Sequence, residues 1–322
     1  IGVSASEIGA FLVLLLFKRP GRAEKPNKEK LTELLKIALP QTIGMAAIPV
    51  MNSVDSAIVM NVLMKTGYTA SKAASLFGLY SGFVLPLVSL PALLSSAVSM
   101  SLVPSLAAAC ANDRKGLQKR LAELGIKCGM LIGIPCAVIF FFLGQPLLDF
   151  LYRGLNAAEV STAAELVRLM APGALFLCLC QTLGGVLQGF SRAEVSVVNL
   201  LLGAAVKLAL GWSLMMVPGL GIKGAAISTS LCYMLTAALN GMGSIKYSSC
   251  SFTFGDFIVK PLAAGGFMAA ALYAFLQCFA GMRNAPKLFI SVFLSLLVYA
   301  VSARLLRLLS KNDIRGLSLY AE

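Results

Sequence analysis

Long apolar stretches constrain this chain more than any other feature of its sequence. Nine segments of about 18 or more mostly apolar residues are each long enough to cross the hydrocarbon core of a bilayer as a helix. They cover approximately residues 1–17, 37–64, 75–108, 122–144, 164–190, 195–217, 222–243, 261–281 and 287–308. The sequence therefore predicts an all-α, polytopic membrane helix bundle of about nine transmembrane helices.

Composition restricts the chemistry of the chain. Only 13% of the 322 residues are charged, about half the share in soluble domains. The chain has no His, so it can form neither a His-ligated zinc site nor a His-based triad. Its eight Cys include no CxxC pair, and we expect them to be small buried hydrophobes. Without a Walker loop or a cluster of acids, we expect a transporter with no cofactor, metal site or catalytic residue.

Basic residues gather in alternate connecting segments, which predicts the orientation. One set of segments holds 17 Lys and Arg and the other holds six, within a formal net charge of +13. Cytoplasmic loops of membrane proteins collect Lys and Arg, so the richer set and the C-terminus are expected in the cytoplasm. These clusters need no nucleic-acid partner to explain them.

Three segments have special roles in this interpretation. Residues 18–36 are the most polar part of the chain and fit either an interfacial amphipathic lead-in or a solvated loop. The segment 75–108 is too long for a straight perpendicular helix and contains Pro86, Pro91 and Pro104, so a bend or tilt is expected there. The first apolar segment begins at Ile1 without a basic leading region, which favours a helix of a longer protein over a signal peptide.

Two ionisable residues lie inside predicted spans, Asp55 in the second and Lys207 near the centre of the sixth. A charge at membrane depth costs about 2.5 to 3.5 kcal/mol on insertion scales, so such residues normally face the interior of a bundle. The lysine side chain is long enough for the two to pair. They form either a structural ion pair or a charge site for a substrate or a coupling cation.

Weaker polar residues follow helical spacing on four spans. They are Asn52 beside Asp55 on the second span, Gln181 and Gln188 on the fifth, Asn199 with Lys207 on the sixth, and Thr229 and Tyr233 on the seventh. One such stripe could serve interhelical hydrogen bonds, but four with two charges favour a water-accessible central cavity. We take all eight residues as candidates for binding a substrate or an ion.

The remaining features indicate contacts between helices rather than a binding site. Gly125, Gly129 and Gly133 form two overlapping GxxxG units on the fourth span, which predicts a helix packing face. The eighth and ninth spans carry little that is polar and are expected at the periphery. Glu165 and Arg168 are three residues apart on the fifth span, and we expect them to pair locally.

Several of these stretches resemble one family. The run 76–105, with its GxYxG, LPL and LP elements and a closing VPS, is similar to the bent eighth helix of the stage V sporulation protein B group of polysaccharide biosynthesis exporters. The stretches 187–207 and 218–229 resemble helices ten to twelve of that group, and 51–59 resembles its seventh. The matches cover most of residues 37–245.

The resemblance implies a domain organisation. The superfamily also contains the lipid II flippases and the multidrug and toxin extrusion (MATE) antiporters, whose members have two lobes of about six helices each. On this basis residues 1–17 are the end of a first-lobe helix, 18–36 the cytoplasmic interlobe linker, 37–245 the second six-helix lobe, and 246–322 two extra transmembrane helices with a cytoplasmic tail. The rest of the first lobe is then a missing N-terminal part of the same protein.

The function implied by the resemblance is export of a lipid-linked oligosaccharide. We expect a flippase for an undecaprenyl-diphosphate-linked glycan, a lipid II-like peptidoglycan precursor, that works by alternating access of two lobes within membrane lipid. A monovalent cation is a candidate coupling partner. Two alternatives stay open: a cation-coupled multidrug antiporter with Asp55 as the coupling carboxylate, and a noncatalytic membrane scaffold for envelope synthesis.

Overall fold

The computed structural model describes residues 53–248, 255–279 and 284–308, and every regular element in these ranges is a helix. The first helix covers residues 53–65. The later elements are α3 (Ala70–Leu79), η1 (Tyr80–Val84), α4 (Leu85–Ala111), α5 (Lys115–Leu151), α6 (Ala157–Gly189), α7 (Ala193–Met215), α8 (Ile222–Ser248), η2 (Gly255–Val259), α9 (Lys260–Cys278) and α10 (Asn284–Leu305). By length and composition, seven helices of the described part could cross a membrane.

These seven helices correspond one to one to the last seven predicted spans, from 75–108 onward. The first predicted span, 1–17, and the polar segment 18–36 lie outside the described residues. The second span is described only from residue 53, where the chain is helical as far as residue 65. An all-helical membrane fold is therefore confirmed, whereas the count of nine helices is not.

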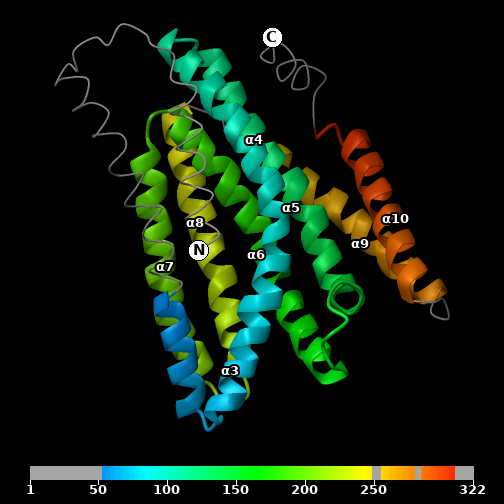
Figure 1. Cartoon of the computed structure of the whole chain (residues 1–322). Helices are drawn as coiled ribbons and strands as arrows, with labels where there is room; N and C mark the ends of the chain where they lie inside the picture. Colours follow the sequence, from blue (N-terminus) through cyan, green and yellow to red (C-terminus); the bar gives the residue numbers. More distant parts are fainter. Residues whose placement is uncertain (1–52, 249–254, 280–283, 309–322) are drawn as a thin grey trace, which may run out of the picture. The chain divides into compact units, whose positions relative to one another are not determined.

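The helices alternate in direction, so the connections fall at two ends of the bundle. The turns between α4 and α5 and between α6 and α7 lie at one end, together with the last residues of α8 and α10 (Figure 1). The turns between α5 and α6 and between α7 and α8 lie at the other (Figure 1). The described connections predicted to be cytoplasmic thus share one end. The side of the membrane that this end faces stays a prediction.

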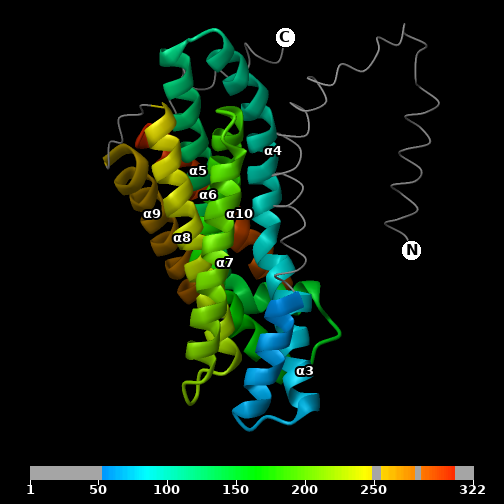
Figure 2. The ribbon, with the colours of Figure 1, turned by 90° about the vertical axis from the view of Figure 1, so that its left-hand side faces the viewer.

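Helix α6 is the centre of the packing. It contacts α4, α5 and α8 extensively, and α8 in turn packs along α7. Helices α9 and α10 pack mainly on each other and on α5 (Figures 1 and 2). This agrees with the peripheral place expected from their apolar sequences.

The proline-rich span 75–108, for which a bend or tilt is predicted, contains a distortion of its helix. Helices α3 and α4 form one continuous stretch, Ala70–Ala111, but Tyr80–Val84 makes a π-helical turn in which the Leu85 N–H bonds to the Tyr80 carbonyl. Pro86 follows at once, and a proline ring removes one helical hydrogen bond and clashes with the preceding turn. A π turn widens the helix and absorbs such a conflict.

The glycines of α5 form a packing face, as predicted. A Cβ atom at Gly129 would lie 2.6 Å from the Thr182 hydroxyl, and one at Gly133 would lie 2.9 Å from the Leu175 Cα. Helix α6 therefore approaches the bare backbone of α5 along this stripe. The seven described cysteines are free thiols, but only Cys178 and Cys232 are buried and Cys278 is exposed, so their predicted burial is confirmed only in part.

We predict that Gly133→Ala destabilises the protein although alanine is the better helix former. The new methyl group would press on the α6 backbone, and overpacking of this kind costs about 1 to 3 kcal/mol. Gly116→Ala is the matched control, because a Cβ there meets nothing within 4 Å and gains helix propensity. Thermal unfolding in detergent should show a lower midpoint for Gly133→Ala only; equal midpoints for the two variants would contradict this packing.

Candidate functional site

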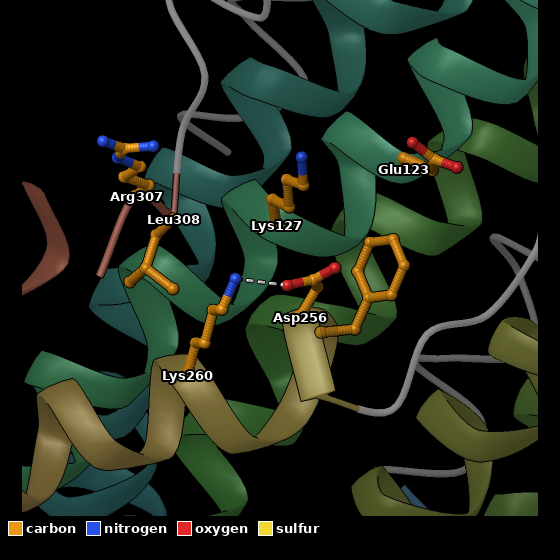
Figure 3. Close-up of a pocket in the computed structure, with 7 residues that line it drawn as sticks. Glu123, Lys127, Asp256, Lys260, Arg307 and Leu308 are labelled. Carbon is orange, nitrogen blue, oxygen red and sulfur yellow. Dashed lines mark ion pairs between the residues drawn. The ribbon is translucent and has the colours of Figure 1, made fainter.

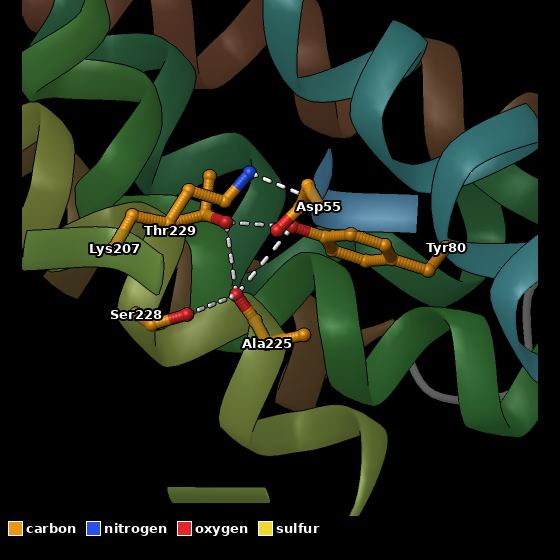
Figure 4. Close-up of polar contacts among 6 residues, drawn as sticks. All are labelled: Asp55, Tyr80, Lys207, Ala225, Ser228 and Thr229. Atoms are coloured by element: carbon orange, nitrogen blue, oxygen red, sulfur yellow. Dashed lines mark hydrogen bonds and ion pairs between the residues drawn. The ribbon is translucent and has the colours of Figure 1, made fainter. Parts of the chain in front are cut away.

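The two intramembrane charges form an ion pair. The Lys207 Nζ lies 2.8 Å from the Asp55 Oδ2, and the two side chains are 15% and 13% exposed. Asp55 comes from the helix 53–65 and Lys207 from α7, 152 residues apart in sequence. Figure 4 shows the ammonium and the carboxylate pointing toward each other. Both charges are thus largely sheltered from surrounding lipid.

A cluster of hydroxyl groups lies beside this pair. The Thr229 hydroxyl donates to the Ala225 carbonyl of α8 at 2.9 Å. The Ala225 carbonyl also accepts a hydrogen bond from the Ser228 hydroxyl at 3.0 Å. The Tyr80 hydroxyl of η1 lies 2.7 Å from the Thr229 Oγ1. Tyr80 is fully buried and lies within electrostatic reach of Asp55 (Figure 4). Four segments, namely 53–65, η1, α7 and α8, therefore converge on one polar site.

Small residues on α7 place Lys207 in this site. Gly203 and Gly211 lie four residues before and after it, on the same face of the helix. A Cβ at Gly203 would lie 2.2 Å from the Thr236 Oγ1, and one at Gly211 would lie 3.2 Å from the Ser228 Oγ. Helix α8 can approach α7 closely at both glycines, and the long lysine side chain between them extends to Asp55.

The polar stripes of α7 and α8 face each other. The Asn199 amide donates to the Asn240 Oδ1 at 2.9 Å, and both side chains are buried. The Asn240 amide also lies 3.4 Å from the Ser196 Oγ. In this structure Asn199 therefore joins two helices, which differs from the expectation that it faces a water-accessible cavity. The reason is that the glycines of α7 let the stripes meet directly.

The other predicted residues have different surroundings. Gln181 and Gln188 are exposed side chains of α6. Tyr233 is half-buried on α8, and its backbone carbonyl accepts from the Cys180 thiol at 3.3 Å. Asn52 lies outside the described residues. The structure thus brings Asp55, Lys207 and Thr229 together and adds Tyr80, which lies on a span for which no polar stripe was predicted.

The expected local pair of Glu165 and Arg168 is not what the structure shows. Glu165 instead pairs with Lys223, at the start of α8, at 2.5 Å. The Arg168 Nε donates to the Phe141 carbonyl at 3.2 Å. Glu165 and Arg168 thus each contact a neighbouring helix, α8 and α5, in place of each other. The Glu165–Lys223 pair is 49% and 34% exposed, a useful contrast to the sheltered pair.

The sheltered pair offers one positive and one negative charge to a binding partner. Among the described residues there is no group of three or more His, Cys, Asp or Glu suited to a metal ion. Lys207 can exchange its carboxylate partner for another anion, and Asp55 can then accept another cation. Because each charge keeps a partner, this exchange avoids a bare charge at membrane depth.

We predict that Lys207→Met destabilises the protein more than the double variant Asp55→Asn/Lys207→Met. The single change leaves a sheltered carboxylate without its partner, which costs about 3 to 5 kcal/mol, whereas removal of both charges is often neutral. Thermal unfolding of the purified variants in one detergent measures the difference. A double variant no more stable than the single one would argue against the ion pair.

The fold and this site together define a multipass, all-helical membrane protein with a charged site among its spans. A family model described as "Lipid II flippase MurJ" matches residues 1–303, so the chain belongs to the MurJ family. It is similar to stage V sporulation protein B of Bacillus subtilis (strain 168), at 25% identity over 90% of this chain and 55% of that protein. It is also similar to the lipid II flippase MurJ of the same organism, at 26% identity over 75% of this chain and 46% of the relative. The chain thus spans about half the length of these relatives.

Solved structures support the fold. A lipid II flippase MurJ in an inward closed conformation matches with a TM-score of 0.62 and 20% identity, over 87% of this chain and 56% of that one. An outward-facing multidrug resistance MATE family transporter matches with a TM-score of 0.53 and 18% identity, over 89% of this chain and 68% of that one. The helical arrangement is therefore that of MurJ and MATE proteins.

Proposed function

We propose that this chain is part of a flippase that moves an undecaprenyl-diphosphate-linked glycan, a lipid II-like peptidoglycan precursor, to the outer leaflet of a bacterial plasma membrane. Membership of the MurJ family supports this class of substrate. The observation that carries the proposal is the sheltered Asp55–Lys207 pair, whose atoms lie 2.8 Å apart. It offers a positive charge to an anionic lipid headgroup inside the spans.

In this mechanism the substrate replaces Asp55 as the partner of Lys207. The diphosphate carries more negative charge than one carboxylate and can accept several hydrogen bonds, so the ammonium moves to it. Thr229 and Tyr80 lie beside the pair and can donate to phosphate or sugar oxygens when their mutual bond opens. Asp55 holds Lys207 again after the substrate leaves. The pair therefore acts as an exchangeable counter-ion.

The lobe assignment completes the proposal. We assign residues 1–17 to the end of a first-lobe helix, 18–36 to the cytoplasmic interlobe linker, 37–245 to the second lobe, and 246–322 to two further helices with a cytoplasmic tail. Rocking of the two lobes about the midplane then exposes the site to each leaflet in turn. Gln181 and Gln188 are exposed on α6, Tyr233 is half-buried on α8, and all three would meet substrate in the closed pair of lobes. Asn52, outside the described residues, stays a substrate contact predicted from the sequence. Asn199 instead holds α7 to α8 through its hydrogen bond to Asn240.

The membrane potential provides a driving force for this direction. With the cell interior negative, outward movement of each negative charge gains about 2.3 kcal/mol per 100 mV. While Lys207 is bound to the diphosphate, Asp55 can take a monovalent cation. ATP is not needed in this scheme.

The decisive experiment compares two double variants in a strain that lacks its own flippase. Asp55→Asn/Lys207→Met should abolish complementation while membrane abundance stays normal, because both charges are removed together. The control Glu165→Gln/Lys223→Gln removes an exposed pair of the same type and should complement fully. Growth supported by the first double variant would refute a role of the sheltered charges in transport.

The same strains separate the remaining alternatives. The similarity of the fold to MATE transporters keeps a cation-coupled multidrug antiporter as the second candidate, with Asp55 as the coupling carboxylate. In that case the variant would alter drug resistance and leave the cell envelope intact. A noncatalytic scaffold for envelope synthesis would work equally well without both charges.

A further inference from the structure

A second charged site lies at one end of the bundle, away from the sheltered pair. A cavity of 280 Å³ opens between α5, the turn η2 with the start of α9, and the end of α10. These helices contact one another directly. The cavity is lined by Glu123, Lys127, Asp256, Phe257, Lys260, Arg307 and Leu308, most of them labelled in Figure 3.

The spacing of charges along the helices places this cavity at the level of lipid headgroups. Lys127 and Asp149 are 22 residues apart on α5 with no ionisable group except Cys between them, which is about 33 Å of helix. Lys260 begins α9, which runs to Cys278 with no further charged side chain, about 29 Å of helix. The hydrocarbon core is about 30 Å thick. Lys127 and Lys260 therefore mark the same boundary of that core, at the end predicted to face the cytoplasm.

The charges that line the cavity favour an anion with hydroxyl groups. Three cations face two carboxylates, so the lining carries a positive excess. Asp256 and Lys260 pair at 2.5 Å and are both about half exposed. Lys127 comes from α5, and Arg307 comes from the exposed turn that follows α10 (Figure 3). The cations suit a phosphate group, and the carboxylate oxygens can accept hydrogen bonds from hydroxyls.

Apolar surface adjoins the charged lining. Phe257 and Leu308 contribute buried apolar groups to the cavity. Leu262 and Leu305, two residues from Lys260 and from Arg307 toward the hydrocarbon core, are 51% and 77% exposed. A lipid fits this arrangement better than a free ion does. Its headgroup can contact the charged cavity while its acyl chains contact the exposed apolar helix surface.

We propose that this cavity binds the headgroup of an anionic phospholipid of the cytoplasmic leaflet, of the phosphatidylglycerol type. Basic pockets between transmembrane helices commonly hold such headgroups. The lipid phosphate lies among Lys127, Lys260 and Arg307, and its acyl chains lie along α9 and α10. A bound lipid of this kind joins the two outer helices to α5. The proposal does not depend on what the protein transports.

The test is lipid binding to the purified protein in detergent, measured by native mass spectrometry. Phosphatidylglycerol, phosphatidylcholine and inorganic phosphate serve as the three probes. Phosphatidylglycerol should bind more tightly than phosphatidylcholine, and inorganic phosphate should not displace it. Arg307→Gln should weaken phosphatidylglycerol binding about fivefold, as expected for one surface cation. Arg304→Gln removes an exposed cation of the same helix end that does not line the cavity, and should leave binding unchanged.

Three results would overturn the proposal. Equal losses for Arg307→Gln and Arg304→Gln would mean diffuse attraction by the basic end of the bundle. Displacement by inorganic phosphate would make the cavity a site for a free anion. Stronger binding of undecaprenyl diphosphate than of phosphatidylglycerol, with the same dependence on Arg307, would assign the cavity to the transported class of lipid. Arg307 is exposed, so its substitution should not disturb folding.

Discussion

The cost of placing a charge among lipid chains determines how this protein is organised. Asp55 and Lys207 each add about 2.5 to 3.5 kcal/mol to the free energy of membrane insertion when they lie at membrane depth. Their ion pair and their burial away from lipid reduce this cost. To bring them within 2.8 Å, the helix 53–65 has to lie beside α7. The close approach of α8 at Gly203 and Gly211, and the buried Tyr80 of η1, complete the enclosure. Several helices thus pack around this one ion pair.

The two charged sites use the same chemistry at different depths. The inner pair has single opposite charges, little exposure and neighbouring hydroxyl groups, so its partners can exchange. The cavity at the end of the bundle has several half-exposed charges at the level of the headgroups, where water screens them and a lipid can remain bound. We propose that the inner pair binds the transported lipid and that the cavity at the end of the bundle binds a lipid of the surrounding leaflet.

Much of the fold could be predicted because hydrocarbon imposes a length on every helix. The seven described spans and the glycine face of α5 follow from local patterns of apolar and small residues. The partners of polar residues could not be predicted in the same way. Asn199 faces Asn240 across a helix interface, and Glu165 pairs with Lys223 rather than Arg168, because these contacts depend on which helices lie side by side. Periodicity fixes the face of a helix but not its neighbour, and it missed Tyr80 because this residue belongs to no polar stripe.

The most direct test of the exchange mechanism is the affinity of the protein for undecaprenyl diphosphate, compared among wild type, Asp55→Asn and Lys207→Met. If Asp55 competes with the diphosphate for Lys207, Asp55→Asn should bind the lipid more tightly than wild type, and Lys207→Met should bind it at least about tenfold more weakly, a difference of about 1.4 kcal/mol. Equal losses of affinity in both variants would contradict the account, because they would show that the pair only holds helices together.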